Sequence, residues 1–184
     1  MPVNASPASP APALWDDRDL RDVLGTFATG ITVIATGGPD PVGMTTNSFT
    51  SVSLDPPLVL FCARRSSKVA ARLEEDTAFT VNVLTGEQEH AARHFASSTR
   101  GTGVDSFRPV EWEWGSTVGA PVVTEASSTL ECRVWKAHDG GDHVIYIGEV
   151  LALHRHRNDQ HVLVYLDGDY HRLSRRAATR PRIA

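Results

Sequence analysis

The chain has 184 residues, of which 41% are hydrophobic and 22% charged, a composition typical of a globular protein with one sizeable core. Its formal net charge of −4 argues against nucleic-acid binding as the main role, and no apolar run approaches the length of a membrane span. The first 13 residues have neither a basic start nor a hydrophobic stretch, so we expect a cytoplasmic protein without a secretion signal.

The ordered part of the chain is predicted to open with a helix and a strand. Residues 14–28 carry apolar side chains at helical spacing, with Asp16 as the expected N-cap and Asp19 three residues later. Residues 30–36 are short and β-branched, which favours a strand, and a Gly/Pro turn follows them.

Residues 43–57 form a row of neutral hydroxyl and amide side chains without any charge until Asp55. We expect this segment to be the second strand, closed by Pro56 and Pro57, and residues 58–63 to be a buried third strand. Composition alone favours an exposed edge strand or a serine/threonine-rich turn. The alternative is the lining for a flat, neutral ligand rich in heteroatoms, and a flavin ring with its ribityl chain fits that description.

A basic segment, Arg64-Arg65-Ser66-Ser67-Lys68, precedes a short stretch with helical spacing. The start of a helix presents free N–H groups and a partial positive charge, so serine hydroxyls and cations placed there can hold a phosphate. Taken alone, the same pattern is more often a serine N-cap with solvated arginines.

The middle of the chain is predicted to be strand, helix and loop in that order. Residues 78–84 alternate as a strand, and Thr85 with Gln88 forms the capping box of a helix over residues 87–96. Residues 97–116 have the glycines and prolines of a loop.

The last third is predicted to consist of two hairpins. Residues 128–136 and 143–153 both alternate and are joined by the turn 139–142, and a shorter strand pair, 163–166 and 170–173, follows.

Because strands outnumber helices and hairpins recur, the predicted class is mostly β, an antiparallel barrel with a few peripheral helices. We expect one domain over residues 14–173, a disordered Pro/Ala/Ser tail over 1–13 and a basic disordered tail over 174–184. The two cysteines, Cys62 and Cys132, lie in apolar runs without metal-ligand spacing, so we expect them to be reduced and buried.

Familiar catalytic patterns are incomplete in this sequence. Residues 38–45 match a P-loop except that Met44 replaces its lysine, and no G-x-G-x-x-G or G-x-S-x-G motif is present. His90 and His94 have the spacing of a zinc site but lack the glutamate of H-E-x-x-H, so surface or interface histidines are the better explanation. The chain thus offers no obvious nucleophile or acid–base pair.

His143 follows Gly141-Asp142 at the predicted hairpin tip, where its side chain could reach over a ligand. Spacing alone favours an exposed turn histidine.

Taken together, these segments resemble the flavin reductase family of two-component monooxygenase systems. The resemblance covers about residues 14–173, and the TNSFTSVSLDPPL and GDH elements are the most specific part of it. The matching segments are FATGITVIAT (27–36), GMTTNSFTSVSLDPPLVLFC (43–62), Ser66-Ser67, FTVNVL (79–84), ARHFA (92–96), LEC (130–132), GDHVIYIGEV (141–150) and Y-x-x-L (170–173).

The resemblance implies a split β-barrel homodimer that holds FMN or FAD near the subunit interface. It places a catalytic role on His143, beside the nicotinamide of NADH or NADPH, with Tyr170 near the same pocket. The remaining implied flavin contacts are Thr45, Thr46, Asn47, Ser48 and Ser51 on the ring and ribityl chain, Cys62 and Ala63 in the lining, Ser66, Ser67 and Lys68 at the phosphate, and His94 and Phe95 at the outer part. Many family members have alanine where this chain has Thr46, and a second hydroxyl there is compatible with binding.

The function implied is an NAD(P)H:flavin oxidoreductase that supplies reduced flavin to a separate flavin-dependent monooxygenase or halogenase. Hydride passes directly between nicotinamide and flavin, so such an enzyme aligns two rings and needs few reactive groups of its own. The alternatives are a split-barrel protein that holds flavin without turnover and a zinc hydrolase that uses His90 and His94. No metal is implied by the family, and no nucleic-acid or membrane partner is expected.

Overall fold

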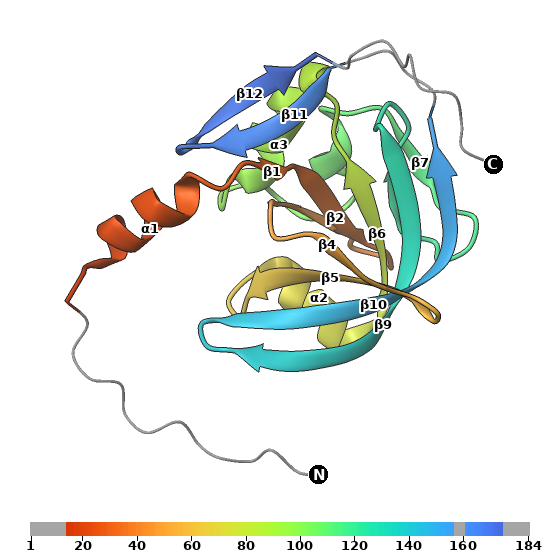
Figure 1. The fold of residues 1–184 in the computed structure, drawn as a ribbon. Coiled ribbons are helices and arrows are strands. Elements are labelled where there is room, and N and C mark those ends of the chain that lie inside the picture. The colour runs from red at the N-terminus through yellow and green to blue at the C-terminus, as the bar shows by residue number, and fades with distance from the viewer. Residues whose placement is uncertain (1–13, 157–160, 175–184) are drawn as a thin grey trace.

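The computed structural model describes residues 14–156 and 161–174, and it is dominated by antiparallel strands, as predicted (Figure 1). Three α-helices accompany the strands in this part of the chain: α1 (Asp17–Gly25), α2 (Lys68–Glu75) and α3 (Glu89–Ala96). Two 3₁₀ turns, η1 (Gly86–Gln88) and η2 (Val104–Phe107), flank α3. Both expected tails, apart from Ser174, lie outside the described residues.

The main sheet has seven strands in the order β3-β2-β6-β9-β10-β5-β4. Its members are β2 (Thr32–Thr36), β3 (Val42–Thr46), β4 (Thr50–Leu54), β5 (Pro57–Arg64), β6 (Ala78–Val83), β9 (Ser128–Gly140) and β10 (His143–Arg155). A small sheet combines β1 (Thr29–Gly30), β11 (Val162–Leu166) and β12 (Asp169–Leu173), and a further pair consists of β7 (Trp112–Trp114) and β8 (Pro121–Val123). Strand β7 lies in the segment 97–116, which the sequence predicts to be loop.

The polar segment 43–57 is two strands, which corrects the single strand expected from its sequence. Its first part, β3, pairs with β2, whereas β4 pairs with β5 at the opposite edge of the main sheet. The break falls at Ser48, whose backbone N–H donates to the Thr46 hydroxyl at 3.2 Å instead of to a neighbouring strand. Hydroxyl side chains that satisfy nearby backbone groups in this way compete with the sheet ladder.

The edge strands β3 and β4 are not paired with each other, so the described residues form an open, strongly curved sheet (Figure 1). The expected barrel is therefore not closed by hydrogen bonds. The Ser48 hydroxyl bridges the gap, because it accepts the N–H of Cys62 on β5 at 2.8 Å. One residue thus joins the connector between β3 and β4 to the other side of the sheet.

Two apolar cores lie on the two faces of this sheet, and β2 contributes to both because successive side chains of a strand point to opposite faces. Ile34 belongs to the first core, with Phe61, Phe79 and the buried face of α2. Val33 and Ala35 belong to the second core, which lies under α3 and the small sheet. The two cores hold α2 and α3 in place at opposite faces of the same strands.

A close backbone approach fixes the position of α3. A side chain at Gly43 on β3 would collide with the Phe95 ring, since a Cβ atom built there lies 2.6 Å from two ring carbons. Glycine therefore permits Phe95, at the end of α3, to lie directly on the strand.

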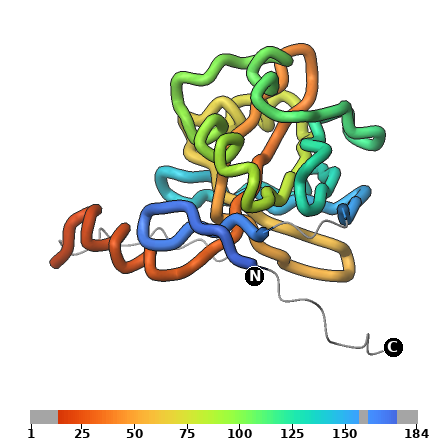
Figure 2. Tube along the Cα trace, turned by 90° about the horizontal axis from the view of Figure 1, so that it is seen from above, coloured from red at the N-terminus to blue at the C-terminus, as the bar shows by residue number. Residues whose placement is uncertain are grey.

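The helix α1 begins as predicted and meets the body of the molecule at its end, where the carbonyl of Gly25 accepts the N–H of Asp167 at 2.8 Å. Asp16 accepts the N–H groups of Arg18 and Asp19, and the Asp19 side chain accepts the N–H of Asp16, which completes a capping box. None of its residues is buried, and the helix projects from the body of the molecule in both views (Figures 1 and 2). Its apolar residues Val23 and Leu24 are 69% and 62% exposed.

The long hairpin β9–β10 is tighter than expected. Its strands run up to Gly140 and resume at His143, so only Gly141 and Asp142 form the turn. Gly141 has φ +77°, a conformation that glycine adopts without strain. Among the described residues, no helix is long and apolar enough to cross a membrane.

Candidate functional site

A cavity of about 530 Å³ lies where the ends of β3, β5 and β10 meet the start of α2 and the end of α3. The residues in its wall come from segments far apart in the sequence. They are Ile31, Met44, Thr45, Thr46, Asn47, Cys62, Arg64, Ser66, Ser67, Lys68, Phe95, Ala96, Ser98, Arg100, His143, Tyr165 and Tyr170.

Most of the predicted site residues lie in this one wall. The structure brings together those that share a neutral or cationic side chain near the sheet end, namely Thr45, Thr46, Asn47, Cys62, Ser66, Ser67, Lys68, Phe95, His143 and Tyr170. Segments 43–62, 64–68 and 141–143 therefore contribute side chains to one cavity wall.

Four predicted residues lie outside the cavity wall. Ala63 points into the first core and is 1% exposed, because it is next to the wall residue Cys62 on a strand. Ser51 is exposed on β4, and Ser48 lies behind the wall, where it holds the backbone of Cys62. The His94 ring bonds the carbonyl of Ser106 through Nε2 at 2.7 Å.

The sequence analysis missed several wall residues that have no local signature. Arg100 belongs to a glycine-containing loop after α3, and Tyr165 lies in β11. Periodicity could place neither of them beside segment 43–62, since only the packing of α3 and the small sheet against β2 does so. The others are Ile31, Ala96 and Ser98, whereas Met44 and Arg64 belong to the polar and basic segments that the sequence already indicates.

The hydroxyl groups of the wall are partly engaged within the protein. Thr45 Oγ1 donates to the carbonyl of Ala92 at 2.7 Å, and Thr46 Oγ1 lies 2.8 Å from Ser48 Oγ. Each hydroxyl keeps further acceptor capacity after these bonds. The polar row is therefore neutral and held by internal hydrogen bonds, and its hydroxyls can still accept from a heteroatom-rich ligand.

The basic turn, which we define as residues 64–68, forms the cationic end of the cavity. Ser67 is the N-cap of α2, and its Oγ accepts the N–H of Ala70 at 3.1 Å. The Lys68 ammonium donates to the carbonyl of Arg100 at 2.5 Å, which ties this turn to the loop after α3. The Ser67 hydroxyl thus has a structural role as a helix N-cap, which is the more common role of a serine in this pattern.

Arg100 provides the test of whether this end suits an anion. Its Nε atom is buried without a hydrogen-bond partner among the described residues, and its guanidinium otherwise donates to the carbonyl of Ser97. Burial lowers the pKa of Arg100 below its usual range. No aspartate or glutamate lies in the described cavity wall, whereas Arg64, Lys68 and Arg100 do. A phosphate fits this end, because it would supply the missing acceptor and the missing charge.

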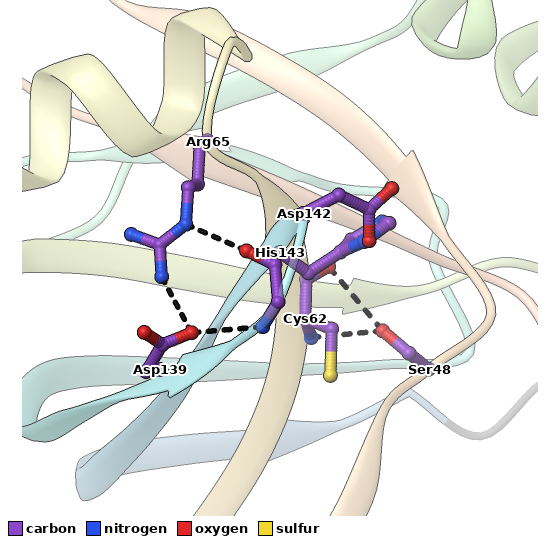
Figure 3. A network of polar contacts seen from close by, with 7 residues as sticks. Ser48, Cys62, Arg65, Asp139, Asp142 and His143 are labelled. Atoms are coloured by element: carbon purple, nitrogen blue, oxygen red, sulfur yellow. Dashed lines mark hydrogen bonds and ion pairs between the residues drawn. The ribbon is translucent and has the colours of Figure 1, made fainter. Parts of the chain in front are cut away.

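His143 stands at the rim of the cavity on the first residue of β10, opposite Arg64 of β5. Its Nδ1 lies 2.7 Å from an oxygen of Asp142, and this hydrogen bond lowers the pKa of the Asp142 carboxyl group. The carboxylate accepts, so Nδ1 carries the proton and Nε2 is left for a ligand. Figure 3 shows the two side chains at the hairpin tip near Cys62.

Aromatic side chains form another part of the wall. The rings of Tyr165 and Tyr170 have centroids 5.3 Å apart in an edge-to-face arrangement, and the Arg93 guanidinium lies 4.8 Å from the Tyr170 centroid. Burial raises the pKa of Tyr170, so its phenol stays protonated at neutral pH. These flat surfaces suit the stacking of a ring.

The two histidines of the zinc alternative do not converge. His90 bonds the carbonyl of Pro109 at 3.1 Å, whereas His94 bonds that of Ser106. The described residues include no cluster of three or more metal-ligating side chains. Both imidazoles instead fasten α3 to the segment that follows it.

The chain resembles known proteins over most of its length. Residues 24–174 match the family model described as a flavin reductase like domain. An NADH-dependent FAD reductase from Streptomyces globisporus is 47% identical over 157 residues, which are 84% of each chain. FMN reductase (NADH) SmoA from Agrobacterium fabrum is 41% identical over 162 residues, 87% of this chain and 88% of that protein.

Solved structures give the same picture. BorF, the flavin reductase component of a bacterial two-component tryptophan halogenase, has a TM-score of 0.83 at 41% identity, covering 88% of this chain and 100% of that chain. The Streptomyces globisporus NADH:FAD oxidoreductase SgcE6, in complex with NAD and FAD fragments, has a TM-score of 0.79 at 43% identity, covering 89% and 94%.

Proposed function

The chain belongs to the flavin reductase like family, and on that basis we propose that it is an NAD(P)H:flavin oxidoreductase. It takes a hydride from NADH or NADPH to FMN or FAD, and supplies the reduced flavin to a separate flavin-dependent monooxygenase or halogenase. Relatives named as NADH-dependent FAD and FMN reductases support NADH as the donor. BorF, named as the component of a halogenase, supports the separate partner.

The observation that carries this proposal is the division of the cavity into two chemically different ends. One end is cationic and free of acids among the described wall residues, with the buried Nε of Arg100 lacking a partner. The other is neutral, with the hydroxyls of Thr45 and Thr46 held in fixed positions. A flavin nucleotide has a phosphate at one end and a neutral heteroatom-rich ring at the other, so it matches both.

The protein's part in the reaction is to bind and align, since hydride transfer is chemistry that the nicotinamide and the flavin supply when bound. Thr45, Thr46 and Asn47 would hold the ring, and Arg64, Lys68 and Arg100 the phosphate. His143 would orient the nicotinamide at the rim through Nε2. No side chain has to act as a nucleophile.

The assay that tests this function mixes the purified protein with FMN or FAD and with NADH or NADPH, in all four pairs. We expect loss of nicotinamide absorbance with at least one pair. A protein that is yellow as purified yet oxidises neither NADH nor NADPH would instead be a flavin carrier without turnover. Absence of both flavin binding and turnover would dispose of the proposal.

We also propose that the active form is a homodimer built on α1, with each subunit a split β-barrel. The support is the apolar face of α1, where Leu20, Val23 and Leu24 are exposed, together with Phe27 just after the helix, which is also exposed. Leu24 and Phe27 border a groove that reaches Asn47 and Ser48 next to the cavity. A second subunit that covers α1 would therefore also cover the open side of the flavin site.

The remaining proposals concern the boundaries of the domain and the location of the protein in the cell. We propose a single domain over residues 14–173, which nearly coincides with the range matched by the family. We further propose a cytoplasmic location, where both free cysteines would stay reduced.

A further inference from the structure

Arg65 connects two parts of the site without touching the cavity itself. Its backbone N–H donates to the carbonyl of Asp142 at 3.1 Å, and its Nε donates to the carbonyl of Gly141 at 2.8 Å. One terminal nitrogen lies 2.7 Å from Asp139, whose carboxylate also accepts the N–H of Gly141 at 2.8 Å. Figure 3 shows the bonds that the Arg65 side chain makes to Asp139 and to the hairpin tip.

We propose that Arg65 is a positioning residue that clamps the tip of the β9–β10 hairpin to the basic turn and so fixes His143 over the cavity. The proposal rests on the proposed function, because it concerns where the nicotinamide is held. Arg65 is absent from the cavity wall, whereas its neighbours Arg64 and Ser66 belong to it. Any effect of Arg65 on the reaction must therefore pass through the residues that it holds.

The geometry makes this more than an ordinary surface ion pair. Side chains of Arg65 and Asp139 are 50% and 81% exposed, and an isolated pair of that kind adds little to stability. Here, however, the planar guanidinium binds the carbonyl of Gly141 in the turn and the carboxylate of Asp139 just before it, which lysine cannot do in one plane. Both bonds to residue 141 act on a glycine with φ +77°, the point where the hairpin reverses.

His143 follows this turn directly, and its register with Arg64 continues the ladder by which β10 pairs with β5. Without the bonds to Arg65, the pairing of β10 with β5 remains, but the turn can change the angle at which it leaves the sheet. A displaced His143 makes a poorer hydrogen bond to the nicotinamide, while the flavin end of the site stays intact. We therefore expect weaker nicotinamide binding with little change in flavin binding.

The test compares Arg65→Ala, Asp139→Asn and Arg65→Lys with the wild type, in steady-state kinetics and flavin titration. For Arg65→Ala we expect KM for NADH to rise about fivefold, with kcat at saturating NADH and the flavin Kd both within about twofold. Asp139→Asn should act in the same direction, and Arg65→Lys should give an intermediate KM because it restores the charge without the fork.

Hydrogen exchange of the ligand-free protein supplies a measurement independent of activity. Amides of residues 139–145 should exchange about tenfold faster in Arg65→Ala, while those of β6 keep their wild-type protection. The matched control is Arg133→Ala, which breaks an exposed pair with Glu149 on the same two strands, far from the tip. We expect it to change neither KM nor exchange at 139–145.

The outcomes separate this inference from the proposed function. If the wild type oxidises NADH but Arg65→Ala and Arg133→Ala have the same KM and the same exchange at residues 139–145, the clamp alone is overturned. A change in flavin Kd without a change in KM would overturn it too, because Arg65 would then act on the basic turn only. Inactive wild-type protein would remove the proposed function, and exchange at residues 139–145 would still decide whether the clamp exists.

Discussion

The Asp142 carboxylate holds the ring of the next residue, His143, by a hydrogen bond of 2.7 Å to Nδ1. The two residues are adjacent at the start of β10, so the bond fixes the ring relative to its own backbone. Because Nδ1 is engaged with the carboxylate, Nε2 is the nitrogen that can meet a nicotinamide at the rim. The neighbour in sequence thus sets both the orientation and the tautomer of the residue proposed to be catalytic.

Replacing His143 with alanine should damage the nicotinamide step and spare flavin binding. We expect kcat/KM for NADH to fall about tenfold, since one orienting hydrogen bond is lost, and the flavin Kd to stay within about twofold. Stopped-flow or steady-state oxidation of NADH and a flavin fluorescence titration measure the two quantities. His138→Ala, on the exposed side of the same hairpin, is the control. Equal kinetics in His143→Ala and His138→Ala would return His143 to the role of an exposed turn residue.

Replacing Arg100 with methionine should weaken flavin binding about tenfold, because the cation that meets the phosphate is removed. The melting temperature of the flavin-free protein should stay level or rise, since a partly buried charge without a carboxylate partner among the described residues is removed. Fluorescence titration and a thermal melt check both. Arg108→Met, at an exposed arginine paired with Asp105, is the control. Unchanged flavin affinity in Arg100→Met would contradict the assignment of the phosphate end.

Alkylation should distinguish the two cysteines. Burial, with the nearby Glu131 charge, raises the pKa of Cys132 to about 12, so this thiol should stay unlabelled by iodoacetamide at pH 8. Cys62 is only partly buried and lies in the cavity wall, so it should label, and more slowly when FAD is added. Mass spectrometry of the digested protein gives the site. Labelling of Cys62 at equal rates with and without saturating FAD would place the flavin elsewhere.

Stability should fall in mild acid because of carboxylates around the site. Hydrogen bonds lower the pKa of Asp139, Asp142 and Asp169 below the ordinary value of 3.8. The unfolded chain therefore binds protons at a higher pH than the folded one, so this stability is complete above about pH 5 and is lost as pH falls through the folded values.

The measurement is a series of thermal melts from pH 6 to pH 3. Asp169→Asn should reduce the fall in melting temperature by about 1–3 °C, a small effect because the carboxylate is exposed. Asp55→Asn, at an exposed carboxylate on the β4–β5 turn, should leave the profile as in the wild type. An Asp169→Asn profile parallel to the wild type would refute the contribution of this group.

A charge on the apolar face of α1 should separate the proposed dimer. Leu24→Asp costs little in a lone subunit, where Leu24 is 62% exposed, but would bury a carboxylate in an interface. Light scattering coupled to size-exclusion chromatography should show the wild type at twice the chain mass and the variant at the chain mass. Val104→Asp changes a similarly exposed residue outside α1. A wild type that elutes as a monomer would refute the dimer.

Local patterns predicted much of the fold. The alternation in residues 78–84 and 143–153, and the Asp16 cap of α1, reflect contacts within a few residues, and the structure confirms them. The predicted capping box at Thr85 is represented by one hydrogen bond, in which the Gln88 side chain accepts the backbone N–H of Thr85 at 3.0 Å.

Long-range pairing could not be predicted in the same way. Nothing local indicates that β3 and β4 join opposite edges of the main sheet, or that Arg100 would reach the basic turn. The direction of the Ala63 side chain follows from local pattern alone, because side chains alternate along a strand and Ala63 is next to the wall residue Cys62. His94 was placed toward the flavin by family resemblance, whereas its ring is occupied by the carbonyl of Ser106.

The connector between β3 and β4 has a consequence for how the protein matures. Strands β3 and β4 are consecutive in the chain but lie at opposite edges of the main sheet. The wall around Asn47 therefore exists only after every intervening strand has docked. Such non-local topology slows folding, and a half-assembled chain has no rudimentary pocket to offer. Competence to bind should therefore arrive all at once, as the final event of folding, and added flavin cannot rescue a variant that stalls before the last strand is in place.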